Sequence, residues 1–193
     1  MDPGDELVDV VDEEDRVVGV VPRREMRARR LRHRCTYVLV RNGRGELYVH
    51  RRTETKDVFP GMHDVTVGGV VLHGEGYDEG ARRELREELG VDAPPTFRFR
   101  LRYDGEDGPA WGAVYDLTWD GPVHPQEEEI AWGAFLPVEE VRRLLEEVPF
   151  CPDGVLVLRR WLGEGDRIRA GGEGGPPPPA APAGRPGRPR ARG

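Results

Sequence analysis

The feature of this sequence that most restricts its fold is a fixed spacing of residue types between Gly69 and Val91. Glu75 follows Gly69 after five residues, and seven residues later comes the segment Arg83–Val91, which reads RELREELGV. A chance match at these positions is expected on the order of once in a hundred thousand chains of this composition. The pattern predicts a glycine-rich loop that leads into an amphipathic helix over Tyr77–Leu89, which the following glycine ends.

Three carboxylates of this helix fall on one side of it. At about 100° per residue, Glu84, Glu87 and Glu88 lie within about a third of the circumference. They border an apolar stripe that can seat the helix on a sheet, made of Tyr77, Ala81, Leu85 and Leu89. Like charges near a buried surface repel each other and lose water, and a hard divalent cation removes that cost. We therefore predict that these glutamates bind Mg²⁺ or Mn²⁺.

The same residues also fit an acidic, solvated helix face. Arg82, Arg83 and Arg86 alternate with the glutamates, and Arg83 and Glu87 have the spacing of an ion pair between adjacent helical turns. On the helix alone, a solvated face and a metal site are equally good interpretations. The spacing of the whole segment favours the metal site.

Strand and helix patterns alternate through the rest of the chain up to residue 163. β-rich runs at Leu7–Asp12 and Val17–Val21 predict an N-terminal hairpin, and Asn42-Gly43 predicts a second one. We expect strands at 35–40, 46–51, 65–72, 96–103, 112–118 and 130–135, and further helices at 23–31, 138–147 and 153–162. This order predicts an α/β domain in which helices cover a sheet.

Charge and hydropathy argue against several classes of function. The chain has 29 basic and 36 acidic residues, and residues 164–193 hold six arginines and three acids, so residues 1–163 carry a net charge of −10. An acidic body is not the electrostatic footprint of a nucleic-acid-binding protein. No apolar run approaches the roughly 18 residues of a membrane span, and the acidic N-terminus is unlike a secretory signal. We therefore expect a cytoplasmic protein with no nucleic-acid or membrane partner.

The cysteines and the C-terminal segment complete this picture. Cys35 and Cys151 are far apart in the sequence and have no partner at metal-ligand spacing, which argues against a disulfide framework or a zinc site. Residues 164–193 are rich in glycine, proline and arginine and cannot bury enough apolar surface to fold. We expect them to form a disordered tail.

The spacing from Gly69 to Val91 matches the signature of the Nudix hydrolases at every fixed position, and the chain resembles that family. The resemblance implies an α/β fold, the Nudix α/β/α sandwich, with a mixed central sheet and a loop–helix–loop on one side of it. It implies a Nudix hydrolase domain over residues 1–163, with the N-terminal β-hairpin as an extension.

The resemblance also implies roles for individual residues of the signature. The metal-binding glutamates of the family correspond to Glu84, Glu87 and Glu88. The arginine that orients a glutamate through a salt bridge corresponds to Arg83. Glu75 is expected to lock the loop or to contact the metal through water.

Residues 6–162 further resemble the YfcD-type bacterial branch of the family, which is related in sequence to isopentenyl-diphosphate isomerase. The supporting segments lie outside the signature: VDVVD at 8–12, LRHR at 31–34, RRTETKD at 51–57 and FPGM at 59–62. Within one of them, Arg51, Arg52 and Lys56 are candidates to bind substrate phosphates, because arginine forks match phosphate oxygens. Strand alternation points one of Arg51 and Arg52 inward and does not decide which.

The implied reaction is metal-assisted hydrolysis of a phosphoanhydride bond. The substrate would be a small nucleoside-diphosphate-type molecule: a nucleoside di- or triphosphate, or a nucleoside diphosphate linked to another group. A bound cation neutralises phosphate oxygens and activates water, and a carboxylate takes the proton. Glu87 and Glu88 are candidates for that base. So is an acid from a late loop, for which we prefer Glu129 among Glu127–Glu129, because it directly precedes an apolar strand.

Two other classes of function stay open as alternatives. Isopentenyl-diphosphate isomerases use a cysteine near the segment that reads DVTVG here, at 64–68, which has none, and both cysteines of this chain lie elsewhere in the sequence. A non-catalytic nucleotide-binding protein is the second alternative. Regulators of that kind carry an added DNA-binding domain, and no helix-turn-helix pattern precedes Glu6 or follows Leu162. The sequence favours no particular substrate within this class and no particular oligomeric state.

Overall fold

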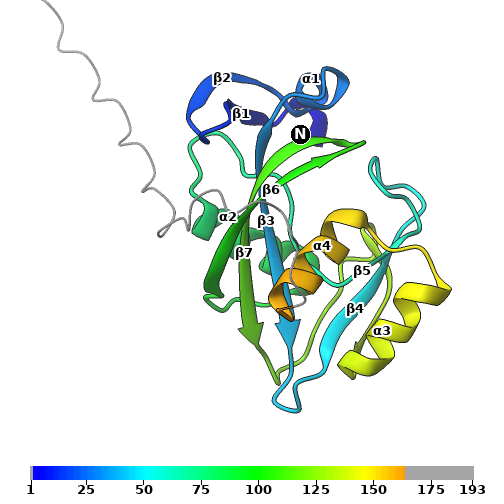
Figure 1. Ribbon diagram of the computed structural model, residues 1–193. Coiled ribbons are helices and arrows are strands. Elements are labelled where there is room, and N and C mark those ends of the chain that lie inside the picture. The colour runs from blue at the N-terminus through cyan, green and yellow to red at the C-terminus, as the bar shows by residue number, and fades with distance from the viewer. Residues whose placement is uncertain (1, 164–193) are drawn as a thin grey trace, which may run out of the picture.

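Strand β3 (His33–Arg41) lies at the centre of the fold, because its alternating side chains enter two different hydrophobic cores. Tyr37 and Leu39 point to one face of the sheet, and Val38 and Val40 point to the other. This alternation is the geometry of a strand that is covered on both faces. The computed structural model, which describes residues 2–163, places β3 inside a mixed sheet (Figure 1).

Within the described residues, eight strands form this sheet. β3 pairs in parallel with β7 (Gly108–Thr118) along its whole length, and the other strand pairs are antiparallel. β6 lies on the far side of β7, and β4 pairs with both β5 and β8. The bounds of the remaining strands are β1 Leu7–Val11, β2 Val17–Pro22, β4 Leu47–Arg52, β5 His63–Asp64, β6 Thr96–Gly105 and β8 Ile130–Leu136.

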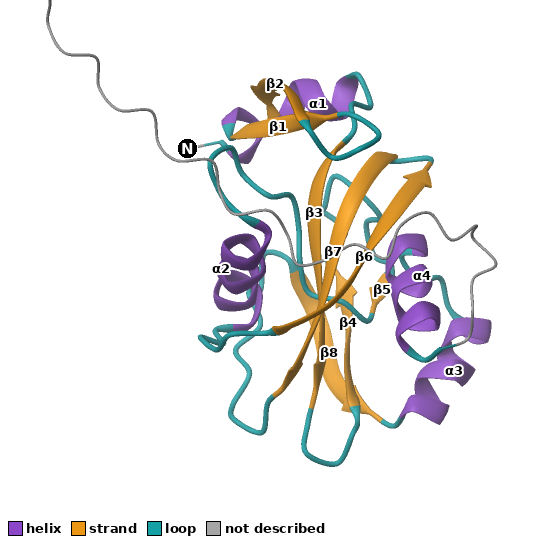
Figure 2. Ribbon diagram, turned by 60° about the vertical axis from the view of Figure 1, so that its left-hand side comes forward, coloured by secondary structure: helices purple, strands orange, loops and turns teal. Residues whose placement is uncertain are grey.

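Helices cover both faces of the sheet (Figure 2). α2 (Tyr77–Leu89) packs on the face to which Val38 and Val40 point. α3 (Val138–Glu147) and α4 (Pro152–Trp161) pack on the opposite face. This arrangement confirms the predicted α/β/α sandwich with a mixed central sheet.

Helix α2 begins and ends where its sequence predicts. The Glu79 side chain accepts a hydrogen bond from the Gly76 N–H at 2.8 Å, and Gly90 takes the left-handed conformation, with φ of 66°, after the last turn. The predicted apolar stripe is buried, none of it more than 2% exposed: Tyr77, Ala81, Leu85 and Leu89. Burial of this stripe fixes the rotation of the helix, and so fixes where its glutamates point.

The expectation of a continuous strand over 65–72 is wrong. The segment runs antiparallel along β3 but makes only isolated bridges with it, Val67 to Val38 and Val70 to Cys35. The pairing is interrupted at Gly68, where the chain passes so close to β3 that a Cβ would lie 2.0 Å from the carbonyl oxygen of Thr36. The segment has room for this approach because β3 and β4, which form the predicted second hairpin, pair only next to their turn.

The N-terminal extension packs against one end of β3. The predicted hairpin is present as β1 and β2, and it is followed by α1 (Arg23–Ala28), which is shorter than the helix expected at 23–31. Met26 of α1 is buried against Val8 and Val70, so the extension rests on the loop that precedes α2. A single 3₁₀ turn, η1 (Pro3–Asp5), precedes the hairpin. In Figure 1 these elements lie above the end of the sheet.

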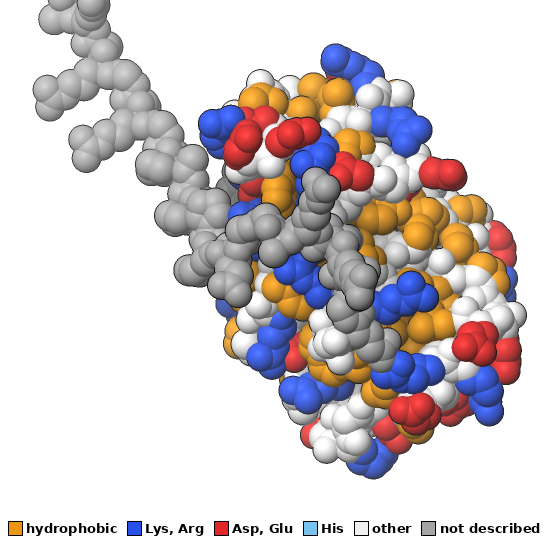
Figure 3. Space-filling model, viewed as in Figure 1, with side chains coloured by type: hydrophobic (Ala, Val, Ile, Leu, Met, Phe, Trp, Pro, Cys, Tyr) orange, Lys and Arg blue, Asp and Glu red, His pale blue; other side chains and the backbone are white. Residues whose placement is uncertain are grey.

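The tail expected at 164–193 lies outside the described residues. Among residues 2–163, no helix has the length and apolar character needed to cross a membrane. On the face of the molecule shown in Figure 3, acidic and basic side chains are interspersed over the helices and strands, in small groups of either sign.

Candidate active site

Arg83 connects the residue spacing from Gly69 to Val91 to the geometry of the site, because its guanidinium contacts three carboxylates at once. Nε and Nη2 donate to the two oxygens of Glu75, at 2.9 and 3.0 Å. Nη1 donates to Glu84 at 2.8 Å and to Glu87 at 3.0 Å, and Nη2 also reaches the carbonyl oxygen of Val70. Glu75 in turn accepts the N–H of Leu72 at 3.0 Å. One arginine therefore joins the loop before α2 to the carboxylates of the helix itself.

The three glutamates of α2 differ in exposure. Glu84 and Glu88, one turn apart, are 9% and 4% exposed, whereas the Glu87 side chain is 54% exposed and pairs with Arg83. The structure thus brings Glu84 and Glu88 together at the buried edge and leaves Glu87 on the solvent side. The predicted ion pair between Arg83 and Glu87 is also present. The same helix therefore carries both predicted features. Glu84 and Glu88 form a buried carboxylate pair, and Glu87 forms a solvent-exposed ion pair with Arg83.

The buried pair is electrostatically costly as it stands. Burial raises the pKa of Glu88 well above its usual value, and the neighbouring charges of Glu84 and Glu129 raise it further. Burial also raises the pKa of Glu84, against the opposing effect of Arg83. Gly69 allows this crowding, because a Cβ there would lie 2.5 Å from Oε1 of Glu84. Buried carboxylates that repel one another, beside a backbone without a side chain, suit a hard divalent cation such as Mg²⁺ or Mn²⁺.

Glu129 lies beside Glu88 and belongs to the loop that precedes β8. The loop is tied to the end of α2, since the N–H of Gln126 donates to the carbonyl of Glu88 at 2.9 Å. Glu129 binds the ammonium of Lys56 at 2.6 Å. Although burial favours its neutral form, the contact with Lys56 and a hydrogen bond with Glu88 lower the pKa of Glu129. Of the three acids proposed from the sequence, Glu129 is the one beside Glu88.

Arg51 and Arg52 point in different directions. Arg52 lines a cavity and donates from Nε to the carbonyl of Val58 at 3.2 Å. Arg51 is exposed, pairs with Glu54 at 2.5 Å and does not line that cavity. The structure therefore places Arg52 and Lys56, but not Arg51, where they could contact a ligand inside it.

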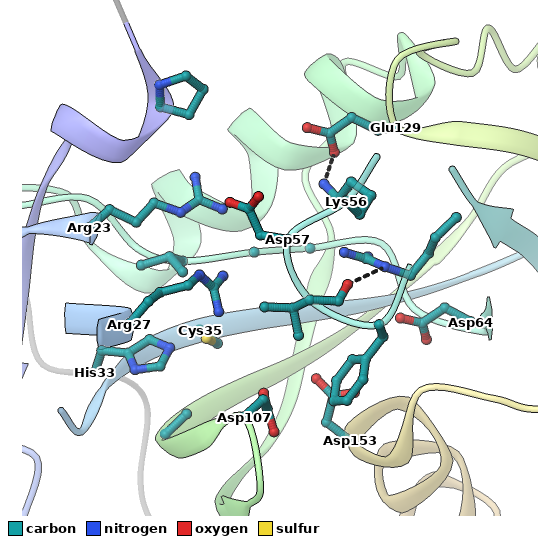
Figure 4. Close-up of a pocket in the computed structure, with 18 of the residues that line it drawn as sticks. Arg23, Arg27, His33, Cys35, Lys56, Asp57, Asp64, Asp107, Glu129 and Asp153 are labelled. Atoms are coloured by element: carbon teal, nitrogen blue, oxygen red, sulfur yellow. Dashed lines mark hydrogen bonds and ion pairs between the residues drawn. The ribbon is translucent and has the colours of Figure 1, made fainter. Parts of the chain in front are cut away.

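The cavity has a volume of about 810 Å³ and lies between the extension, the sheet and the loops at 52–59 and 126–129 (Figure 4). Gly69 and Glu129 form part of its wall, and Glu84 and Glu88 lie directly behind them. The loops hold each other in place, because the Thr53 N–H donates to the carbonyl of Glu129 at 3.0 Å. A cleft of this size accommodates a molecule as large as a nucleotide.

Sequence reasoning missed a second set of polar groups in this region. Asp64, Cys151 and Asp153 place ligand-type atoms within 4.8 Å of one another. Burial raises the pKa of Asp153 to about 7, and burial also raises the pKa of Asp64. Asp64 has a structural role, because its Oδ1 accepts the N–H groups of Val65 and Thr66 where β5 ends. These residues come from segments far apart in the chain, so no local spacing could have revealed them.

Cys35 is also nearer to the site than its sequence position indicates. It lines the cavity, across an isolated bridge from Val70, and burial raises the pKa of its thiol to about 12. Arg23, Arg27 and His33 line the same end of the cavity. The N-terminal extension therefore contributes directly to the wall of the site.

Comparison with known proteins agrees with this geometry. The NUDIX domain family matches residues 31–156. The chain is 48% identical over 169 residues to the Nudix hydrolase SCO1686 of Streptomyces coelicolor, covering 84% of this chain and 93% of that protein. It is 41% identical over 158 residues to the Nudix hydrolase YfcD of Escherichia coli K12, covering 81% and 87%. The crystal structure of DR0079 from Deinococcus radiodurans superimposes with a TM-score of 0.66 at 33% identity, covering 80% and 98%.

Proposed function

The chain belongs to the NUDIX domain family and is a Nudix hydrolase, and from this premise we propose that it cleaves a phosphoanhydride bond in a nucleoside-diphosphate-type substrate with the help of Mg²⁺ or Mn²⁺. The observation that carries the proposal is the buried pair Glu84 and Glu88, of which Glu84 is held by Arg83, beside a large cavity that Arg52 and Lys56 also line. The carboxylates suit a divalent cation and the cavity suits a phosphorylated ligand.

The proposed metal ligands are Glu84 and Glu88, with Glu87 on the solvent side and Glu129 on the cavity side. A cation bound there would neutralise phosphate oxygens and lower the pKa of the attacking water. Arg83 keeps Glu84 in place through the contact at 2.8 Å. Gly69 leaves the backbone bare where a side chain would displace Glu84.

Glu129 is the proton acceptor that we favour. Its lowered pKa keeps it ionised near neutral pH, as a general base must be. It borders the cavity, whereas Glu87 is engaged with Arg83 and Glu88 has a raised pKa. Glu88 and Glu87 are the remaining candidates for this role.

Substrate phosphates would bind to Lys56 and Arg52. Both line the cavity, and Lys56 lies 2.6 Å from Glu129, so a phosphate on Lys56 would lie next to the proposed base. Arg51, which does not line the cavity, is not part of the proposed phosphate site.

One observation favours a second candidate function. Isopentenyl-diphosphate isomerases protonate an alkene with a cysteine, and Cys35 carries a neutral thiol in the cavity wall. Isopentenyl diphosphate therefore belongs among the compounds to be tested, with Cys35→Ser as the variant that would abolish its rearrangement but not phosphoanhydride hydrolysis.

The deciding experiment measures release of phosphate and pyrophosphate from a panel of compounds. The panel comprises nucleoside di- and triphosphates, ADP-ribose, dinucleoside polyphosphates, nucleotide sugars and isopentenyl diphosphate, each with Mg²⁺, Mn²⁺ or EDTA. We expect metal-dependent release from at least one nucleotide, lost in Glu88→Gln and retained in the matched control Glu146→Gln, an exposed glutamate of α3. If Glu88→Gln kept the wild-type rate on every substrate, the proposed metal site would be wrong.

A further inference from the structure

Arg27 extends from α1 into the cavity, where none of the described carboxylates pairs with its charge (Figure 4). Its Nε is buried and has no hydrogen-bond partner, and within residues 2–163 no carboxylate oxygen lies within 4.0 Å of its guanidinium nitrogens. Arg27 as a whole is half-buried, and its buried Nε has given up water without gaining an acceptor, which is costly. Within residues 2–163, the charge of Arg27 is therefore not paired with a carboxylate.

The neighbouring arginines of α1 are paired, which sets Arg27 apart. Arg23 donates to Glu6 at 3.0 Å, and Arg24 pairs with Asp2 and Asp5 at the surface. Arg29, which directly follows α1, pairs with Glu25 of that helix at 2.6 Å. A helix of six residues thus satisfies its surface arginines and presents Arg27 to the cavity.

Among residues 2–163, the groups around Arg27 do not neutralise its charge at ion-pair distance. His33 has its Nδ1 at 3.0 Å from the carbonyl of Leu31, and burial lowers its pKa to about 4, so its ring is neutral. The thiol of Cys35 is neutral as well. The acids that interact electrostatically with Arg27 are Asp57 and Asp107, neither within ion-pair distance, and Arg23 adds a like charge.

We propose that Arg27 binds a phosphate group of the substrate, so that the N-terminal extension forms part of the substrate site. This inference rests on the proposed function, since it assumes that the substrate occupies the cavity shared with Glu129 and Lys56. The phosphate has two possible sources: the diphosphate that is cleaved, or a separate phosphate elsewhere on the same substrate. Either source would give a guanidinium the paired hydrogen bonds that it lacks.

The first test is calorimetric binding of inorganic pyrophosphate, which needs no turnover, to the full-length protein. We expect Arg27→Met to weaken binding about tenfold or more, and Arg29→Met, an exposed matched control just after the end of α1, to leave it unchanged. Arg27→Lys should retain part of the affinity, because it keeps the charge and loses the fork. Thermal unfolding of each variant confirms that the fold is intact. Equal binding by Arg27→Met and Arg29→Met, or no binding by the wild-type protein, would overturn the proposal.

The second test distinguishes the two sources of phosphate. KM and kcat are measured for a hydrolysed nucleoside diphosphate and for the same compound with an additional 3′-phosphate. A raised KM in Arg27→Met on both compounds assigns the cleaved diphosphate, whereas a raised KM on the second alone assigns the separate phosphate. An unchanged KM on both contradicts the proposal. The wild-type protein can also fail to hydrolyse any compound while Arg27→Met still binds pyrophosphate more weakly than the wild type. In that case the hydrolase proposal fails and the phosphate site stands.

Discussion

At the scale of single residues, Arg83 connects more of the site's carboxylates than any other side chain described above. Its one side chain joins the loop at Glu75 to the helix at Glu84 and Glu87, and only 19% of that side chain is exposed. The favourable contacts offset the desolvation of the guanidinium, but they make each carboxylate dependent on it. Removal of Arg83 would therefore leave two largely buried carboxylates, Glu75 and Glu84, without a counter-charge.

We expect Arg83→Met to lower the free energy of unfolding by about 2–4 kcal/mol. Arg86→Met, on the exposed side of the same helix, should change it by less than about 0.5 kcal/mol. Urea titration of the two variants beside the wild type measures both values. A loss in Arg83→Met no greater than in Arg86→Met would mean that the contacts of Arg83 contribute no net stability.

The raised pKa of Asp153 predicts how the stability of the fold depends on pH. Burial and the neighbouring Asp64 raise the pKa of Asp153 to about 7 in the folded protein, above its ordinary value of 3.8. The folded state then binds the proton more tightly than the unfolded state, so this group stabilises the fold at low pH. That contribution is lost as the pH rises from about 4 to about 7.

Asp153→Asn cannot titrate, so its stability relative to the wild type should rise between pH 5 and pH 8. Melting temperatures of both proteins across this range measure the difference. Asp92→Asn, which alters an exposed carboxylate, serves as the control and should show no such trend. A difference between Asp153→Asn and wild type that stays constant with pH would contradict the raised pKa.

At the scale of elements, the loop before α2 depends on glycines for two different reasons. Gly69 needs space, because a Cβ would lie 2.5 Å from Glu84. Gly74 needs conformational freedom, because its φ is +82°. Apart from its two chain neighbours, no atom of residues 2–163 lies within 4 Å of where its Cβ would be. The same kind of substitution should therefore have different effects at the two positions.

We expect Gly69→Ala to displace the Glu84 carboxylate and reduce kcat by at least about tenfold, as other misplaced catalytic groups do. Gly74→Ala should retain activity and lose about 1 kcal/mol of stability from strain in the left-handed region. Steady-state kinetics and urea unfolding of both variants separate the two effects. Full activity in Gly69→Ala would show that the position of Glu84 is not critical.

The elements that sequence reasoning predicted best are those with a strong local pattern. α2 has caps at both ends and an unbroken apolar stripe, and α3 likewise spans the predicted residues 138–147. For the segment 65–72 the local pattern is misleading. Its β-branched residues favour a strand, but the close approach of Gly68 to β3 interrupts the strand pairing. Long-range contact, rather than local propensity, decided its conformation.

At the scale of the whole molecule, the site combines residues that only the tertiary fold brings together. Glu84 and Glu88 could be identified from their spacing on one helix. Arg27, Asp64 and Asp153 could not, because the first comes from the extension and the other two from segments of the chain far apart in sequence that meet only in the fold. Sequence reasoning thus located the carboxylate end of the site and missed the opposite end.

A cation that binds the folded chain and not the unfolded one stabilises the entire domain. At a free concentration one hundred times its Kd, Mg²⁺ or Mn²⁺ should raise the melting temperature by about 5–10 °C. Because burial and neighbouring charges raise the pKa of Glu88, protons compete with the metal, and the increase should be smaller at pH 6 than at pH 8.

The variants locate the ion that causes this stabilisation. If the cation binds at Glu84 and Glu88, Glu88→Gln should lose the increase in melting temperature, while Asp153→Asn and Glu146→Gln keep it. If it binds instead at Asp64, Cys151 and Asp153, whose ligand-type atoms lie within 4.8 Å of one another, Asp153→Asn should lose the increase in melting temperature. Glu88→Gln and Glu146→Gln should then keep it. Chelation with EDTA should return the wild-type protein to its metal-free melting temperature in either case, so the contrast between Glu88→Gln and Asp153→Asn identifies the site at which metal binding and folding are coupled.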